Sequence, residues 1–182
     1  MTPTPPTEDE RLGQLHGALG IPANYAARTG LPRIHEAPET VLVTRPDGQN
    51  RPLAPQAAAA WGVLEAAAER DGVRLLLLSG FRSLEYQAEL VRRKLEQGVT
   101  LADVLSVIAA PGYSEHHSGH AVDIGTPGCE PLSESFEHTR AFAWLQRHAP
   151  RHGFHLSYPR ANGRGIIYEP WHWALSPLPV AD

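Results

Sequence analysis

The chain has 182 residues, 42% of them hydrophobic, which is enough for one domain with a sizeable core. Its formal net charge is −4, and acidic and basic residues are interspersed, so neither a nucleic acid nor an anionic membrane surface is indicated as a partner. The single cysteine, Cys129, excludes an internal disulfide and a zinc site closed by several thiolates. We expect one globular domain that is monomeric.

The N-terminal residues carry no recognisable targeting signal. The first thirty contain neither a charged-then-apolar leader nor a long apolar run, so we expect no secretory signal and no membrane span. As written, the chain would be cytoplasmic. Residues 1 to about 8 are rich in Pro and Thr, which is typical of disorder. We expect residues 1–37 to form a partly disordered N-terminal arm.

A hairpin, a helix and a buried strand are predicted next along the chain. Residues 40–44 and the segment after Asn50 flank residues 46–48, where Pro presets φ and Gly accepts a positive φ. The Ala-rich run 55–70 is strongly helix-forming. Residues 73–78 are apolar except for Arg74 and lie between Gly72 and Gly80, which suits a buried strand.

The remaining elements alternate between helix and strand. Ser83 can cap a helix that runs to about Gln97, and Thr100 begins a shorter one. The later predicted elements are a strand over 119–125, a helix over 134–148, and strands over 154–158 and 165–168. Because the elements show no regular βαβ rhythm, we expect an α+β domain with a small, mostly antiparallel sheet flanked by helices.

The strongest chemical signal lies in residues 114–123 (SEHHSGHAVD) and 169–172 (EPWH). They supply two imidazoles, a carboxylate ligand and a spare carboxylate, which is what a catalytic zinc with an open position for water requires. His116 and Asp123 are seven residues apart, too far to be neighbours on one regular strand, so we expect a turn at Ser118–Gly119. Pro170 keeps its preceding residue out of the α region, so the second motif is not the helix of an HExxH protease.

Three motifs in this order resemble those of a known family. The pattern Ser-x-His-x-x-Gly-x-Ala-x-Asp is filled by residues 114–123, and Glu-x-Trp-His is filled by residues 169–172. An upstream element stands here as Ser-Gly-Phe-Arg-Ser at 79–83, followed by Gln87. Residues 38–175 thus resemble the zinc D-alanyl-D-alanine carboxypeptidases and dipeptidases of bacterial cell-wall metabolism, the VanY-like and VanX-like enzymes. The resemblance implies their fold, which Hedgehog-type signalling domains share.

The resemblance also implies roles for individual residues. His116, Asp123 and His172 would bind one Zn²⁺ per chain, and Glu169 would be the general base. Arg82 would bind the substrate's carboxylate or the oxygen that becomes negative, a role that suits a guanidinium because it pairs bidentately with carboxylates. Further expected substrate contacts are Gln87, Ser114, Tyr158 and Trp171.

Two other histidines lie in the first motif, at its variable positions. His117 and His120 are expected to be non-ligands that line the rim of the site.

The implied activity is removal of the C-terminal D-alanine from peptidoglycan stem peptides or precursors that end in D-Ala-D-Ala, with residues 38–182 as the catalytic domain. A peptidoglycan endopeptidase of the lysin or effector type, or a D-Ala-D-Ala dipeptidase, would use the same site, and the lack of a leader favours the lysin or effector type. A non-catalytic zinc-binding module is a third hypothesis, against which the presence of both Glu169 and Arg82 argues. The substrate belongs to the cell envelope, so the export route stays open.

Overall fold

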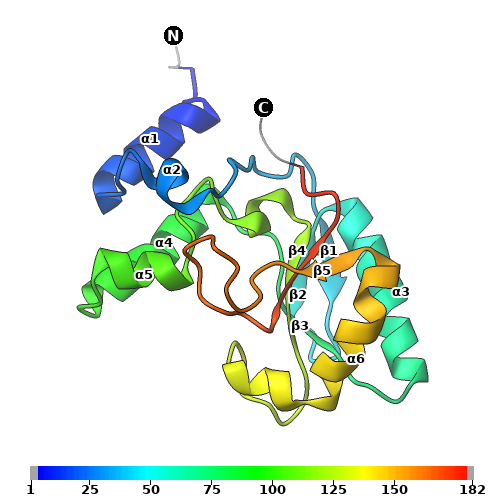
Figure 1. The fold of residues 1–182 in the computed structure, drawn as a ribbon. Coiled ribbons are helices and arrows are strands. Elements are labelled where there is room, and N and C mark those ends of the chain that lie inside the picture. Colours follow the sequence, from blue (N-terminus) through cyan, green and yellow to red (C-terminus); the bar gives the residue numbers. More distant parts are fainter. Residues whose placement is uncertain (1–3, 180–182) are drawn as a thin grey trace.

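A four-stranded antiparallel sheet forms the centre of the molecule (Figure 1). The computed structural model describes residues 4–179. In spatial order the strands are β3 (Leu76–Ser79), β4 (Ala121–Gly125), β6 (His172–Leu175) and β5 (Phe154–Leu156). A separate antiparallel hairpin is formed by β1 (Val41–Thr44) and β2 (Asn50–Leu53). The predicted α+β class and antiparallel sheet are confirmed.

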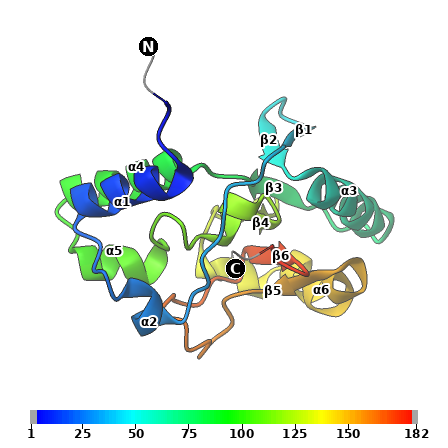
Figure 2. The same ribbon diagram turned by 90° about the horizontal axis from the view of Figure 1, so that it is seen from above.

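The helices lie in two groups on either side of this sheet (Figures 1 and 2). One group contains α3 (Pro55–Arg70) and α6 (Arg140–His148). The other contains α1 (Glu8–Leu19), α2 (Tyr25–Thr29), α4 (Leu84–Glu96) and α5 (Leu101–Val107). Three short 3-10 helices complete the described structure: η1 (Glu115–Ser118), η2 (Glu134–His138) and η3 (Ala149–His152). The helix predicted over 55–70 has those bounds, and Ser83 caps α4 as expected, since its hydroxyl accepts a hydrogen bond from the Tyr86 amide.

Two buried clusters correspond to the two groups of helices. The first packs α3 and α6 against the sheet and includes Trp61, Phe154, Trp171 and Trp173. The second joins α1, α2, α4 and α5, and it also contains Tyr158. Because Tyr158 belongs to one cluster and Trp171 to the other, residues 158–171 connect the two cores. The candidate site described below lies at this junction.

Residues 8–37, expected to belong to a partly disordered arm, contain α1 and α2. A capping box begins α1, because the Thr7 hydroxyl accepts from the Glu10 amide and the Glu10 carboxylate accepts from the Thr7 amide. Ion pairs join Arg11 to Glu36 at 2.7 Å and Arg33 to Glu8 at 2.9 Å. Residues 1–3 of the predicted disordered stretch lie outside the described residues, and the division at residue 38 stays a prediction.

Two predicted elements are wrong. Residues 165–168 are not a strand, because Gly165 has a φ of 70° and the Ile167 amide bonds the Ser106 carbonyl instead of a neighbouring strand. The helix predicted over 134–148 is interrupted at Thr139, whose backbone is extended and whose hydroxyl accepts from the Phe142 amide to cap α6. A long-range backbone hydrogen bond replaces the regular pattern in the first place, and a local side-chain hydrogen bond replaces it in the second.

Within residues 4–179, no helix is long and apolar enough to cross a membrane.

Candidate functional site

Antiparallel pairing of β4 and β6 brings the two predicted motifs together. Asp123 on β4 is directly opposite His172 at the start of β6. His116 lies on η1, and the chain turns back into β4 through Gly119, which has a φ of 68°. A side chain at residue 119 would place its Cβ 2.7 Å from the Ala54 amide nitrogen, so the close approach requires glycine. The predicted turn at Ser118–Gly119 is therefore present.

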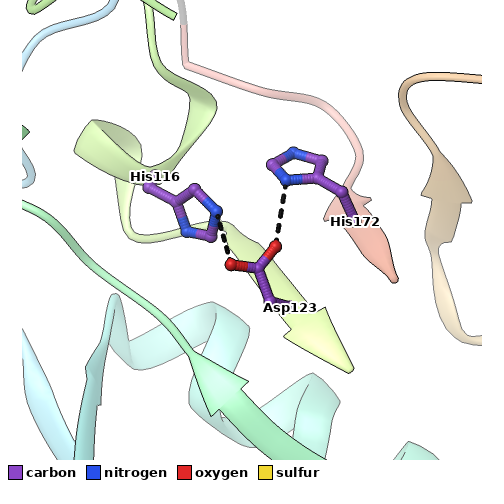
Figure 3. A group of neighbouring side chains, drawn as sticks. All are labelled: His116, Asp123 and His172. Carbon is purple, nitrogen blue, oxygen red and sulfur yellow. Dashed lines mark hydrogen bonds and ion pairs between the residues drawn. The ribbon is translucent and has the colours of Figure 1, made fainter. Parts of the chain in front are cut away.

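The three predicted ligands point toward one another (Figure 3). His116 Nε2 lies 3.3 Å from Asp123 Oδ2, and His172 Nδ1 lies 3.2 Å from Asp123 Oδ1. One donor atom from each of the three residues lies within 4.8 Å of the others, and all three side chains are buried. Among residues 4–179 they are the only group of at least three His, Cys, Asp or Glu side chains close enough to hold a metal ion.

The environment of His116 suits a metal ligand. Its Nδ1 lies 2.7 Å from the Gly80 carbonyl, which can only accept, so Nδ1 carries a proton. Burial and the nearby charge of Arg82 lower the pKa of His116 to about 4, so at pH 7 the ring is neutral and Nε2 offers a lone pair. Within the described chain this buried Nε2 has no hydrogen-bond partner. A buried lone pair facing the Asp123 carboxylate fits a cation held between the two groups.

His172 uses its other ring nitrogen toward the same point. Its Nε2 lies 3.0 Å from Oε2 of Glu115, so Nδ1 is directed at Asp123. Burial lowers the pKa of His172, but hydrogen bonds to Asp123 and Glu115 outweigh it and raise this pKa to about 10. The Glu115 carboxylate is itself buried, and His172 holds its pKa below the usual value against the opposing effect of burial. Sequence reasoning missed Glu115, which occupies a variable position of the motif.

Glu169 lies beside the ligands without belonging to the group. Its Oε2 is 3.7 Å from His172 Nδ1. Burial raises the pKa of Glu169 to about 7, an effect that the nearby His172 opposes and Asp123 reinforces. A carboxyl group with this pKa can both accept and return a proton near neutral pH.

Arg82 is fixed by its backbone as well as by its side chain. Its Nη2 donates to Asp123 Oδ2 at 2.5 Å, and its Nε donates to Ser79 Oγ at 3.1 Å. Its carbonyl accepts from Nδ1 of His117, whose Nε2 accepts from the Gly112 amide. His117 is thus a non-ligand, but it is fully buried, so the expectation that it lines the rim is wrong.

The site opens into a cavity of about 430 Å³. All nine predicted site residues line it: Arg82, Gln87, Ser114, His116, Asp123, Tyr158, Glu169, Trp171 and His172. His120 does not; it lines a separate hollow with His35 and Gln56. A larger cavity of about 580 Å³ lies between the β1–β2 hairpin and the end of α3, but no histidine lines it. Chemistry, rather than volume, therefore identifies the site.

This arrangement has the features of a catalytic rather than a structural metal site. Three protein donors converge from η1, β4 and β6, and a fourth carboxyl group lies next to them. Two imidazoles and a carboxylate are ligands that Zn²⁺ accepts, and sites that perform chemistry keep one coordination position for water or substrate. Hydrolysis of a carbonyl compound is the chemistry that such a group supports.

Comparison with known proteins agrees with the motifs. Residues 50–178 match the family described as VanY, D-alanyl-D-alanine carboxypeptidase. The putative carboxypeptidase YodJ of Bacillus subtilis is 35% identical over 130 residues, which cover 68% of this chain and 46% of that protein. The bifunctional D-Ala-D-Ala dipeptidase and carboxypeptidase VanXYC of Enterococcus gallinarum is 31% identical over 156 residues, covering 82% of this chain and 80% of that one. The chain thus spans less than half the length of the Bacillus relative.

Solved structures show the same architecture. A variant of the vancomycin-resistance D,D-pentapeptidase VanY, in complex with Zn(II), has a TM-score of 0.59 and 27% identity, over 81% of this chain and 86% of that one. The LD-carboxypeptidase LdcB has a TM-score of 0.63 and 28% identity, over 80% of this chain and 66% of that one. Since the family match covers well over half of the sequence, the chain belongs to the VanY family of D-alanyl-D-alanine carboxypeptidases.

Proposed function

We propose that the protein is a zinc-dependent D,D-carboxypeptidase that removes the terminal D-alanine from peptidoglycan stem peptides. The observation that carries this proposal is the convergence of His116, Asp123 and His172 beside Glu169, whose Oε2 lies 3.7 Å from a ligand nitrogen. The family match and the Zn(II) complex of the VanY neighbour support it. The protein would act as a monomer on a cell-envelope substrate.

His116 Nε2, Asp123 and His172 Nδ1 would hold Zn²⁺, which when bound polarises a carbonyl and lowers the pKa of water. Glu169 accepts a proton from the attacking water, because its raised pKa makes it a base near pH 7. The same carboxyl group then returns the proton to the amine of the departing residue. Glu169 therefore serves as base and acid in turn.

Arg82 is placed to recognise the end of the peptide. Two of its nitrogens are engaged with Asp123 and Ser79, whereas Nη1 forms no hydrogen bond within the described residues. Because Arg82 lines the cavity, Nη1 is available to the terminal carboxylate of a substrate. A requirement for a free carboxyl end would distinguish a carboxypeptidase from an endopeptidase.

A second candidate is an L,D-carboxypeptidase, which cleaves a D-alanine that follows an L-centre. It is favoured by the likeness to LdcB, whose TM-score of 0.63 is similar to that of the D,D-specific VanY neighbour at 0.59. The two candidates share the metal site and differ in the residue that the cavity accepts before the scissile bond.

Mass spectrometry of peptide digests tests the proposal. The zinc-loaded protein should release free D-alanine from a stem pentapeptide that ends in D-Ala-D-Ala, and it should not cleave the C-terminally amidated peptide. Release of the dipeptide D-Ala-D-Ala would identify a dipeptidase. Cleavage of a stem tetrapeptide that ends in one D-alanine, without cleavage of the pentapeptide, would identify the L,D-enzyme. Glu169→Ala should retain zinc without activity, whereas His172→Ala should lose both. Wild-type turnover by either variant would overturn the assignment.

A further inference from the structure

The cavity that contains the candidate site continues along one face of α4. Gln87, Leu90 and Lys94 all line it. These residues are spaced i, i+3 and i+7, so they lie on the same face of the helix. Seven residues of α-helix rise by about 10 Å, so the cavity wall extends that far beyond Gln87. A substrate longer than a dipeptide would contact this outer part.

The outer part of the cavity is mainly aliphatic. Its lining includes Leu90, Val107, Ile108, Leu132, Ile166 and Ile167. Val107, Leu132 and Ile167 are exposed by 44%, 49% and 41%, so apolar side chains remain open to water at the mouth. Leu132 also has a φ of 54°, a left-handed conformation that costs a non-glycine residue roughly 1–2 kcal/mol. Exposed aliphatic groups at the mouth of a site are typical of a binding surface.

Two polar groups on α4 interrupt this aliphatic wall. The Gln87 amide donates through Nε2 to the Ala109 carbonyl at 2.8 Å, which leaves Oε1 buried and without a partner among the described residues. This oxygen can accept a hydrogen bond from a peptide N–H. Lys94, the only lysine of the chain, is exposed and forms no ion pair within residues 4–179. It is the only charged side chain on the outer wall.

We propose that Lys94 is a specificity-determining residue that binds a carboxylate of the substrate on the amino-terminal side of the scissile bond. This inference rests on the proposed peptidase function and names its substrate class: extended peptides with an acidic residue upstream. An extended peptide rises about 3.3 Å per residue, so the span from Gln87 to Lys94 corresponds to roughly three residues. Gln87 Oε1 would accept an N–H near the scissile bond, and the aliphatic wall would contact the residues between.

Matched peptides test this proposal. Each pair ends in D-Ala-D-Ala and differs only by Glu or Gln at the second, third or fourth residue before the scissile bond. The wild-type enzyme should show a kcat/KM about two- to fivefold higher for the Glu peptide at one of these positions, as expected for a solvent-exposed ion pair. Lys94→Gln should lower kcat/KM for the Glu peptide toward the value for the Gln peptide and so abolish this preference. Lys94→Glu should reverse it, and Lys94→Arg should keep it.

The control for net charge is Arg93→Gln, because Arg93 is adjacent on α4, exposed and not part of the cavity lining. It should keep the wild-type preference.

Calorimetry with the inactive Glu169→Gln variant measures binding of the same peptides without turnover. It gives the ratio of the affinity for the Glu-containing peptide to that for the Gln-containing peptide. If the Glu peptide binds more tightly than the Gln peptide, and this difference requires Lys94, the Lys94 proposal is supported. If the wild-type protein nevertheless hydrolyses neither peptide, the proposed peptidase function is refuted. Equal affinities, or a preference that survives Lys94→Gln, would overturn the Lys94 proposal.

Discussion

Glu115 accepts a hydrogen bond from Nε2 of His172 at 3.0 Å, and both side chains are buried. This contact determines which nitrogen of His172 faces Asp123. His116 is oriented in the opposite sense, since its Nδ1 donates to the Gly80 carbonyl and its Nε2 faces the site. Each of the two candidate histidine ligands is thus held by an acceptor on its far side, an arrangement that fixes ring orientation and raises ligand basicity.

Removing the Glu115 carboxylate should weaken metal binding more than it weakens folding. We expect Glu115→Ala to lower Zn²⁺ affinity by about 10- to 100-fold, the usual effect of losing the partner of a ligating histidine. Glu115→Gln keeps an acceptor oxygen and should show a smaller loss. Competition with a chromophoric chelator measures both affinities. Glu169→Gln is the matched control, and an unchanged affinity in Glu115→Ala would refute this role.

Metal binding should release protons. In the metal-free protein the pKa of His172 is raised to about 10, so at pH 7 the ring is an imidazolium between Asp123 and Glu115. A metal ion at Nδ1 must displace that proton, so we expect release of about one proton or more per Zn²⁺ bound. Calorimetric titration in buffers of different ionisation enthalpy measures this number. A buffer-independent enthalpy at pH 7 would contradict the protonated state of His172 in the metal-free protein.

The metal-free protein should lose stability through Glu169 as the pH rises. The folded-state pKa is raised to about 7 from an ordinary value of 4.5, so between these values the folded state binds more protons than the unfolded chain. The contribution of Glu169 to the free energy of unfolding is fully present below pH 4.5 and is lost as the pH rises to about 7. Glu169→Gln should therefore gain up to about 3 kcal/mol relative to wild type between pH 5 and pH 8.

Urea unfolding in the presence of a chelator measures this difference. The exposed Glu96→Gln, at the end of α4, is the control and should follow the wild-type profile. Saturation with Zn²⁺ should reduce the Glu169 effect, because a dication stabilises the adjacent carboxylate. A pH-independent difference between Glu169→Gln and wild type would show that Glu169 is not destabilised by burial.

The ligand group could be predicted because its motifs resemble those of a known family and because part of its geometry is encoded locally. Asp123 is on a strand, Gly119 permits the turn that brings His116 back, and Pro170 keeps Glu169 out of a helix. The role of Glu115 could not be predicted in this way. Its partner His172 is distant in the sequence, and a histidine can be oriented by any carboxylate or carbonyl that the fold places behind it.

The same distinction applies to the secondary structure. Elements with a local sequence signal could be predicted, and those that depend on distant contacts could not. Residues 55–70 form the predicted helix because an alanine-rich run is helical without tertiary help. Residues 165–168 have strand-like composition, but their amides and side chains bond η2 and α5, so no ladder forms. The start of α1 had a usable signal in the Thr7–Glu10 capping box, whereas its packing on α4 involves residues distant in the sequence, such as Ala88 and Val91 in the shared buried cluster.

Replacement of Gly119 should damage the site. Its φ of 68° disfavours any L side chain, and an added Cβ would lie 2.7 Å from the Ala54 amide nitrogen, which itself donates to the Gly119 carbonyl. Backbone strain alone costs about 1–2 kcal/mol, and relief of the contact requires the turn to move. Because that turn carries His116, we expect Gly119→Ala to lower both the melting temperature and Zn²⁺ affinity.

The matched control is Gly62→Ala in α3. Gly62 lies in the middle of a helix, and an added Cβ would meet nothing within 4 Å. This substitution should raise stability by about 0.5–1 kcal/mol because alanine loses less conformational entropy in a helix. Thermal unfolding of the two variants with and without Zn²⁺ separates local strain from general loss of stability. If Gly119→Ala unfolds and binds metal like the wild type, the close approach to Ala54 does not hold His116 in place.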